Sequence, residues 1–142
     1  MTSEDLFRPI SSLLEQAGIP YMLTGSFASS VYGMHRGSPN IDFIIAAEEA
    51  AVRRLLDHLP QLNFYSDLSH ALDACGHRSI FNVVDHVTGL KIDFIFLKSR
   101  VFSLEEFRRR KKASVWEVPL YIATPEDVVI SKLDWAKFGK SS

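Results

Sequence analysis

The sequence lacks the features of a secreted or membrane protein. Its one cysteine, Cys75, cannot form a disulfide bond within the chain. The N-terminal residues lack the basic segment and apolar run of a signal peptide, and no apolar stretch approaches the roughly 20 residues that a spanning helix needs. These absences predict a cytoplasmic protein with no membrane partner.

The chain also has little net charge. Its 16 basic and 17 acidic residues give a formal charge of −1 at pH 7, so no chain-wide attraction to nucleic acid is expected, although a local basic patch remains open. Hydrophobic residues make up 46% and charged residues 23% of the sequence, which argues against a disordered chain. A chain of 142 residues without repeats or linkers is expected to form one domain with one core.

Apolar residues at helical spacing predict a first helix that is capped at Thr2 or Ser3 and ends at Gly18. Because proline lacks an amide hydrogen, we expect Pro9 in the first turn and the regular helix to begin later than the cap. Thr124, followed by proline and two acids, predicts a strong start for the last helix. Further helices are expected at 27–33, 48–59, 68–74 and, opened by a capping box, 103–112.

Short runs of apolar residues predict the strands. We expect them at 21–23, 40–45, 63–65, 80–84, 91–97, 115–118 and 120–123. Residues 85–89 are rich in turn formers, so the strands on either side of them should form a β-hairpin.

Two groups of residues invite a functional interpretation that the sequence does not favour. The cations from Arg108 to Lys112 suit a helix C-terminus, and we interpret them as solvated residues in preference to a nucleic-acid contact. His70, Cys75 and His77 lack the paired spacing of a zinc site, so we expect no metal there.

Two aspartates stand in otherwise apolar strands. Asp42 lies within 40–45 and Asp93 within 91–97. A buried acid is costly unless it is paired or binds a cation, so each needs a partner. Two strand-borne carboxylates suit a magnesium ion that holds a polyphosphate. The acids by themselves leave open a buried ion pair with Arg36 or Lys91.

The turn at Gly25 and Ser26 follows the first strand and precedes the expected helix at 27–33. A strand, a Gly-Ser turn and a helix N-terminus in that order place backbone N–H groups where an anion binds. Many such turns use glycine for backbone reasons alone, so the turn has a purely structural interpretation as well.

The order of these motifs resembles that of the polymerase-β-type nucleotidyltransferase superfamily. Its signature is a Gly-Ser turn, then an acid-hydrophobic-acid triplet on a strand, then a third acid on a neighbouring strand. The matching residues here are Gly25-Ser26, Tyr32-Gly33, Arg36-Gly37-Ser38, Asn40-Ile41-Asp42 and Asp93.

A closer similarity is to small prokaryotic proteins related to the toxin half of the AbiEii/AbiGii abortive-infection systems. Similar segments occur there in the same order, namely Phe81-Asn82-Val83 with Thr88-Gly89, Lys91 to Lys98, and Ala123 to Asp127 with Lys132-Leu133. The resemblance covers most of the chain, and the triplet on the second strand is its specific part.

The resemblance implies one α/β (α+β) domain over residues 1–142 with a nucleotidyltransferase fold, a small mixed β-sheet flanked by helices. Relatives usually continue into another helix beyond the position of Ser142. The implied activity binds a nucleoside triphosphate with Mg²⁺ (or Mn²⁺) and transfers a nucleoside monophosphate to an acceptor hydroxyl on a protein, an RNA or a small molecule. A toxin-antitoxin role, with an antitoxin partner, is implied as well.

The resemblance also assigns roles to individual residues. Asp42 and Asp93 would bind the metal and, with Asn40, form the catalytic set. Gly25 and Ser26 would hold the nucleotide's phosphates. Arg36 and Lys132 would neutralise the triphosphate; a salt bridge for Arg36 and a solvated helix position for Lys132 are the structural alternatives.

Asn40 departs from the family pattern because it stands where the first acid of the triplet is expected. Its amide oxygen can ligate a cation, but the site loses a negative charge that would offset metal repulsion. The alternative is therefore a catalytically impaired domain that binds nucleotide or a partner protein. A third hypothesis is a structural domain whose acids form salt bridges.

Overall fold

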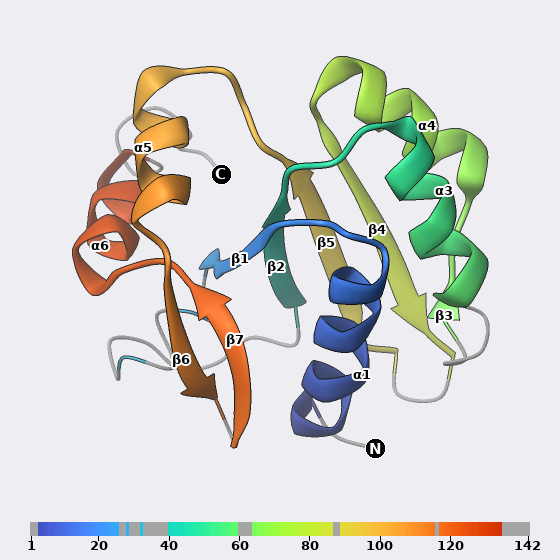
Figure 1. Cartoon of the computed structure of the whole chain (residues 1–142), viewed down its shortest axis with the longest axis horizontal. Helices are drawn as coiled ribbons and strands as arrows, with labels where there is room; N and C mark the ends of the chain where they lie inside the picture. The colour runs from blue at the N-terminus through green and yellow to red at the C-terminus, as the bar shows by residue number, and fades with distance from the viewer. Residues whose placement is uncertain are drawn as a thin grey trace.

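The computed structural model describes residues 3–25, 28, 32, 40–59, 64–86, 89–115 and 117–134. In chain order the elements are α1 (Ser3–Gln16), β1 (Tyr21–Thr24), β2 (Asn40–Ile45), α3 (Glu49–His58), β3 (Phe64–Tyr65), α4 (Leu68–His77), β4 (Ile80–Asp85), β5 (Lys91–Phe96), α5 (Val101–Arg109), β6 (Lys111–Val115), β7 (Val118–Ile122) and α6 (Pro125–Asp134) (Figure 1).

The described strands form one seven-stranded sheet in the order β3-β4-β5-β2-β1-β7-β6. β2 runs parallel to β5 and β1 parallel to β7, whereas the other neighbours are antiparallel. The expected mixed sheet and the hairpin of β4 and β5 are therefore confirmed. Because β2 is inserted between β1 and β5, residues far apart in the sequence become neighbours at the middle of the sheet.

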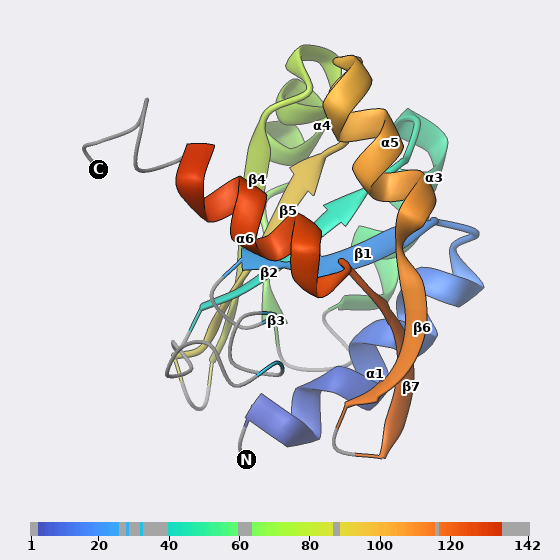
Figure 2. The same cartoon turned by 90° about the vertical axis from the view of Figure 1, so that its left-hand side faces the viewer.

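Helices flank this sheet in two groups. α4 packs against β4, α3 packs against α4, and α1 contacts both α3 and β7. α5 and α6 lie side by side near the edge of the sheet that is formed by β7 and β6 (Figure 1, Figure 2). A bidentate ion pair joins these two helices, in which Arg109 Nε and Nη2 donate to the buried carboxylate of Asp127 at 3.0 and 2.8 Å.

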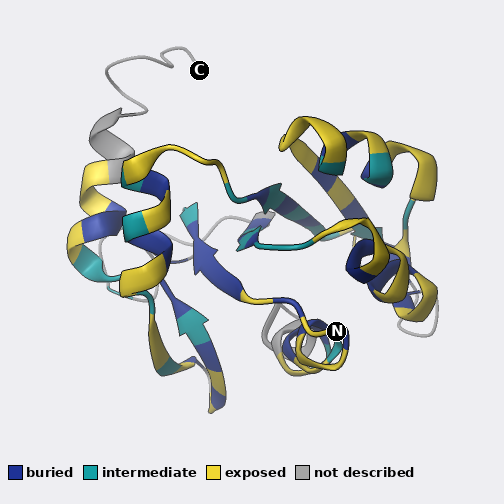
Figure 3. Ribbon diagram, turned by 45° about the horizontal axis from the view of Figure 1, so that its top comes forward, coloured by how far each residue is buried: buried dark blue, intermediate teal, exposed yellow. Residues whose placement is uncertain are grey.

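The core follows from the alternation of side chains along the central strands. Residues of β4 and β5 alternate between buried and less buried positions. Phe81 and Phe94 stack at a centroid distance of 5.2 Å, and Phe43 stacks on Phe94 at 6.2 Å. Figure 3 shows buried residues along the strands and exposed residues on the outer sides of the helices. The opposite side of the same strands is only partly covered, and it carries the two aspartates.

The start of α1 differs from the prediction. The helix begins at Ser3, so Pro9 lies inside it and not in the first turn. Proline removes one helical hydrogen bond, but Ile10 and Leu14 are almost completely buried on the same helix. Their burial offsets the missing bond.

The segment after β5 also differs from the prediction. α5 begins at Val101, so Ser103 is not its N-cap, and the Ser103 hydroxyl instead accepts a hydrogen bond from Arg100 at 3.5 Å. The helix ends at Arg109, and Lys111–Val115 forms β6, which pairs with β7 along its whole length. Pairing with a later strand therefore ends the helix earlier than the charge pattern suggested.

The last helix begins where the sequence predicts. The amide of Asp127 donates to Thr124 Oγ1 at 3.2 Å, which is the hydrogen bond of an N-cap. The expected helix at 27–33 lies outside the described residues except for Ala28 and Tyr32, and so does Asn63 of the third predicted strand.

Candidate functional site

Four polar residues line up across four neighbouring strands. In the parallel pair of β2 and β5, Asp42 lies directly opposite Asp93. β1 adds Thr24 opposite Asp42, and β4 adds Asn82 opposite Asp93. The two aspartates, predicted from separate apolar strands, are therefore direct neighbours at the centre of the sheet.

The two carboxyl groups interact strongly. The pKa of Asp42 is raised from 3.8 to about 7, first by burial, then by the negative charge of Asp93 and by a hydrogen bond with the Asp93 side chain. Lys91 acts in the opposite direction and lowers it. A hydrogen bond between two carboxyl groups needs one proton, so the pair holds that proton until about neutral pH.

Gly25 lies directly beside this pair. It follows the last residue of β1 and has φ +75°, a backbone conformation that favours glycine. A Cβ atom added to Gly25 would lie 2.2 Å from Oδ2 and 3.0 Å from Cγ of Asp42. The turn after β1 thus approaches the Asp42 carboxylate more closely than any residue with a side chain allows.

Polarity changes across this side of the sheet. Two residues beyond the acids, toward the C-terminal ends of β2 and β5, a row of Ile44, Ile95 and Ile80 is paired in register, and Ile80 is 48% exposed. Two residues before the acids, at the start of both strands, Lys91 of β5 is paired with Asn40 of β2. The acids therefore lie between an apolar row and a row with a positive charge.

The structure brings together some of the predicted site residues and leaves others undescribed. Asp42, Asp93 and Gly25 are in direct proximity. The backbone position of Asn40 is fixed opposite Lys91, but its side chain is not described. Ser26 and Arg36 lie outside the described residues, and Lys132 is described only as part of the helix α6.

The site residues predicted from the sequence do not include three neighbours of the acid pair, Thr24, Asn82 and Lys91. The sequence predicts a strand at Asn82, and the signal for a further role is that this residue interrupts the apolar run of β4 on the same side as Asp93. For Lys91 the sequence suggests only an ion pair with one of the acids. Within the described part of the chain, no ion pair joins it to Asp42 or Asp93.

The donor atoms at this site suit a hard cation. Asp42 and Asp93 offer carboxylate oxygens, and Mg²⁺ is usually bound by one or two carboxylates together with water and substrate phosphates. Among the described residues, no group of three or more His, Cys, Asp or Glu side chains is close enough to hold a metal ion. A cation here would therefore take its remaining ligands from water and a bound substrate.

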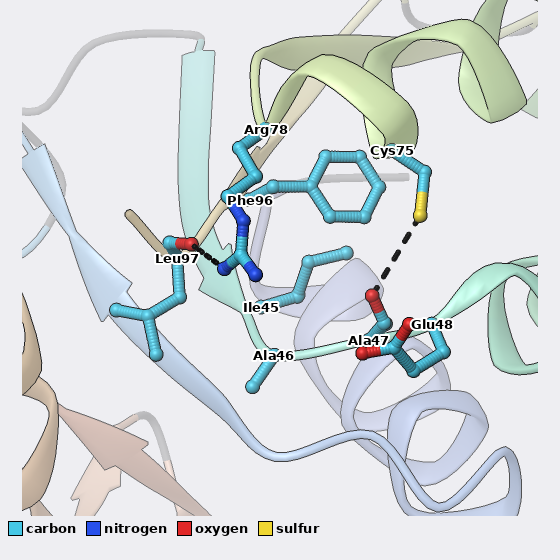
Figure 4. Close-up of a pocket in the computed structure, with 8 residues that line it drawn as sticks. All are labelled: Ile45, Ala46, Ala47, Glu48, Cys75, Arg78, Phe96 and Leu97. Atoms are coloured by element: carbon cyan, nitrogen blue, oxygen red, sulfur yellow. Dashed lines mark hydrogen bonds between the residues drawn. The ribbon is translucent and has the colours of Figure 1, made fainter. Parts of the chain in front are cut away.

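A separate hollow lies at the C-terminal ends of β2 and β5. It has a volume of about 220 Å³ and is lined by Ile45, Ala46, Ala47, Glu48, Cys75, Arg78, Phe96 and Leu97 (Figure 4). Arg78 Nη1 donates to the Leu97 carbonyl at 3.1 Å, and the Cys75 thiol lies 3.7 Å from the Ala47 carbonyl. Because these groups already contact the backbone, the hollow is a weaker candidate than the acid pair.

None of the helices in the described ranges has the length and apolar character that crossing a membrane requires.

No protein-family model matches the chain, and no curated protein sequence matches it. Several solved structures, however, are similar to it in fold. A Thermotoga maritima protein assigned as a nucleotidyltransferase superposes with a TM-score of 0.64 at 13% identity, over 99% of this chain and 91% of the other. The lincosamide antibiotic adenylyltransferase LnuA, with lincomycin bound, gives 0.62 at 12% identity over 92% and 85%. The antibiotic-resistance factor ANT(2'')-Ia gives 0.62 at 11% identity over 96% and 73%. The chain therefore has the nucleotidyltransferase fold.

Proposed function

We propose that this protein binds a nucleoside triphosphate with Mg²⁺ (or Mn²⁺) and transfers a nucleoside monophosphate to an acceptor hydroxyl. The observation that carries the proposal is the in-register pair of Asp42 and Asp93, with Gly25 against the Asp42 carboxylate. The fold shared with adenylyltransferases supports it.

Asp42 and Asp93 would hold the divalent cation. The fit rests on the donor set and on the turn beside it, since the absent side chain of Gly25 leaves room for the Asp42 carboxylate against the turn. The cation supplies positive charge that stabilises the phosphate oxygens as negative charge develops on them.

The chain's own residues then orient the substrates. Gly25 and Ser26 hold the phosphates through the turn, and Arg36 and Lys132 neutralise the remaining charge. Asp93 accepts the proton of the acceptor hydroxyl. The acceptor oxygen forms a bond to the α-phosphorus, the bond from this phosphorus to the bridging oxygen breaks, and pyrophosphate leaves with the electron pair.

The acceptor has two candidate classes with different support. The likeness in fold to an antibiotic adenylyltransferase and to an antibiotic-resistance factor favours a small molecule. The resemblance of its motifs to those of AbiEii/AbiGii toxins favours a protein or an RNA, together with a toxin-antitoxin role and an antitoxin partner. Both classes provide a hydroxyl group, so the same chemistry at Asp93 applies to either.

The test uses each α-³²P-labelled nucleoside triphosphate with Mg²⁺ and candidate acceptors. Transfer by the parent should fall at least about 100-fold in Asp93→Ala. The matched control is Asp57→Asn, which changes an aspartate on the exposed side of α3. If no triphosphate raises the melting temperature of the parent or of Asn40→Asp, nucleotide binding is wrong.

A second candidate is nucleotide binding without transfer. It is favoured by the composition of the row beside the acids, where Asn40 and Lys91 supply an amide and a cation but no carboxylate. Label transfer that occurs in Asn40→Asp and not in the parent would support this candidate.

A further inference from the structure

The position of Lys91 distinguishes this site from a cluster of acids alone. Lys91 and Asp93 are two residues apart on β5, so they lie on the same side of the sheet, roughly 7 Å apart along the strand. Lys91 is in register with Asn40, as Asp93 is with Asp42.

Lys91 has no ion-pair partner in the part of the chain that the structure describes. Its side chain is nevertheless half-buried. An ammonium that no described carboxylate holds in an ion pair is available to an anionic ligand. Beside two aspartates on the partly covered side of the sheet, a bound polyphosphate is such a ligand.

We propose that the site binds one divalent cation, on Asp42 and Asp93, and that the Lys91 ammonium takes the place of a second cation toward the triphosphate. This inference rests on the proposed nucleotide binding and goes beyond it by assigning the number of cations and a role to Lys91.

The charges of the site explain why one cation is preferred. Two-metal phosphoryl-transfer sites hold their ions about 3.5–4 Å apart, which requires carboxylates to offset the repulsion. The described residues supply two carboxylates, Asp42 and Asp93, and the paired position of Asn40 has none. At equal distance, a divalent ion repels an ammonium half as strongly as it repels a second divalent ion. One cation and Lys91 therefore suit this site better than two cations.

The test counts Mn²⁺ and a non-hydrolysable α,β-methylene ATP analogue bound per chain by equilibrium dialysis. The parent is expected to bind one Mn²⁺ with each analogue. The double variant Asn40→Asp with Lys91→Met, which adds a carboxylate and removes the ammonium, is expected to bind two. Two Mn²⁺ per analogue in the parent would overturn this inference and leave the proposed function intact.

The single variant Lys91→Met separates this role from a structural one. It should bind Mn²⁺ alone about threefold more tightly, because a neighbouring positive charge is gone, and the analogue about tenfold more weakly. Lys112→Met is the matched control, since Lys112 lies on the edge strand β6 away from the acids, and it should change neither affinity.

Each remaining outcome has a defined meaning. Shifts of both affinities in the same direction, or shifts no larger than those of Lys112→Met, would overturn the role of Lys91. Melting curves of each variant show whether it is folded. Absence of analogue binding by the folded parent would overturn the proposed function itself, and this inference with it.

Discussion

Gly25 and Asp42 are in such close proximity that a methyl group on the first would overlap the second. An ideal Cβ at Gly25 would lie 2.2 Å from Asp42 Oδ2, well inside van der Waals contact. The glycine therefore has two functions at this position, to adopt φ +75° and to leave room for the Asp42 carboxylate.

Substitution of Gly25 tests this relationship. Gly25→Ala should destabilise the fold by about 1–3 kcal/mol through backbone strain and overlap, and it should also weaken Mn²⁺ binding because the Asp42 carboxylate must move. Thermal denaturation and Mn²⁺ titration measure the two effects.

Gly89→Ala is the matched control for Gly25→Ala. Gly89 has φ +76°, but no described residue other than its chain neighbours has an atom within 4 Å of its added Cβ. It should show the strain without the loss of metal binding. Equal Mn²⁺ affinity in both variants would contradict the proposed contact with Asp42.

The stability of the parent should fall with rising pH because of Asp42. The pKa of Asp42 is about 7 in the folded state, compared with the ordinary value of 3.8 that applies to the unfolded chain. Between these values the folded state binds more protons than the unfolded state, so the free energy of unfolding decreases from about pH 4 to pH 7. Asp42→Asn removes the cost of ionising a buried carboxyl group beside Asp93, so this variant should be more stable than the parent by roughly 1–2 kcal/mol at pH 8.

Urea denaturation of the parent and of Asp42→Asn at pH 4 and pH 8 measures this difference. At pH 4 the two proteins should differ by no more than about 0.6 kcal/mol, because Asp42 is then protonated in the folded protein and about 40% protonated in the unfolded chain. A stabilisation that is equal at both pH values would show that the carboxylate charge is not its cause.

Divalent cation binding should be coupled to proton release. Because the pair of Asp42 and Asp93 holds a proton below about pH 7, a cation must displace it, and the apparent Kd should rise up to about tenfold per pH unit below 7. Calorimetry in two buffers of different ionisation enthalpy should show proton release at pH 6.5 and almost none at pH 8.5. A Kd independent of pH from 5.5 to 8 would contradict this coupling.

The ion pair between α5 and α6 should contribute more to stability than the exposed cation beside it. Asp127 is buried, whereas Arg108 is an exposed partner of Glu105. Asp127→Ala should cost about 1–3 kcal/mol because it removes two charge-assisted hydrogen bonds. Arg109→Met should lower the melting temperature clearly more than Arg108→Met, which serves as the control. Equal effects of the two arginine variants would show that Arg109 is no more than a surface charge.

Local patterns were sufficient for several elements. The alternation of residues in 40–45 and 91–97 places each aspartate on the side opposite the phenylalanines of its strand. The Thr124 cap predicted the start of α6, and turn formers predicted the hairpin of β4 and β5. These features depend on neighbours within a few residues, which the sequence lists directly.

Other elements could not be predicted because distant partners decide them. The charge run from Arg108 to Lys112 was interpreted as a helix end, but Arg109 binds Asp127 and Lys111 begins a strand that pairs with β7. Lys91 had an ambiguous role for the same reason, since its register with Asn40 depends on the parallel pairing of β2 and β5.

The sequence by itself determined that two acids lie in apolar strands and that a glycine turn follows the first strand, because period-two alternation and backbone preference are local properties. Only the tertiary structure decided that these features meet. The strand order places Asp42 opposite Asp93, brings Gly25 against the Asp42 carboxylate and sets Lys91 beside them. That convergence depends on non-local strand pairing and on burial, which raises the pKa of Asp42 to about 7, and neither is contained in any short segment of the chain.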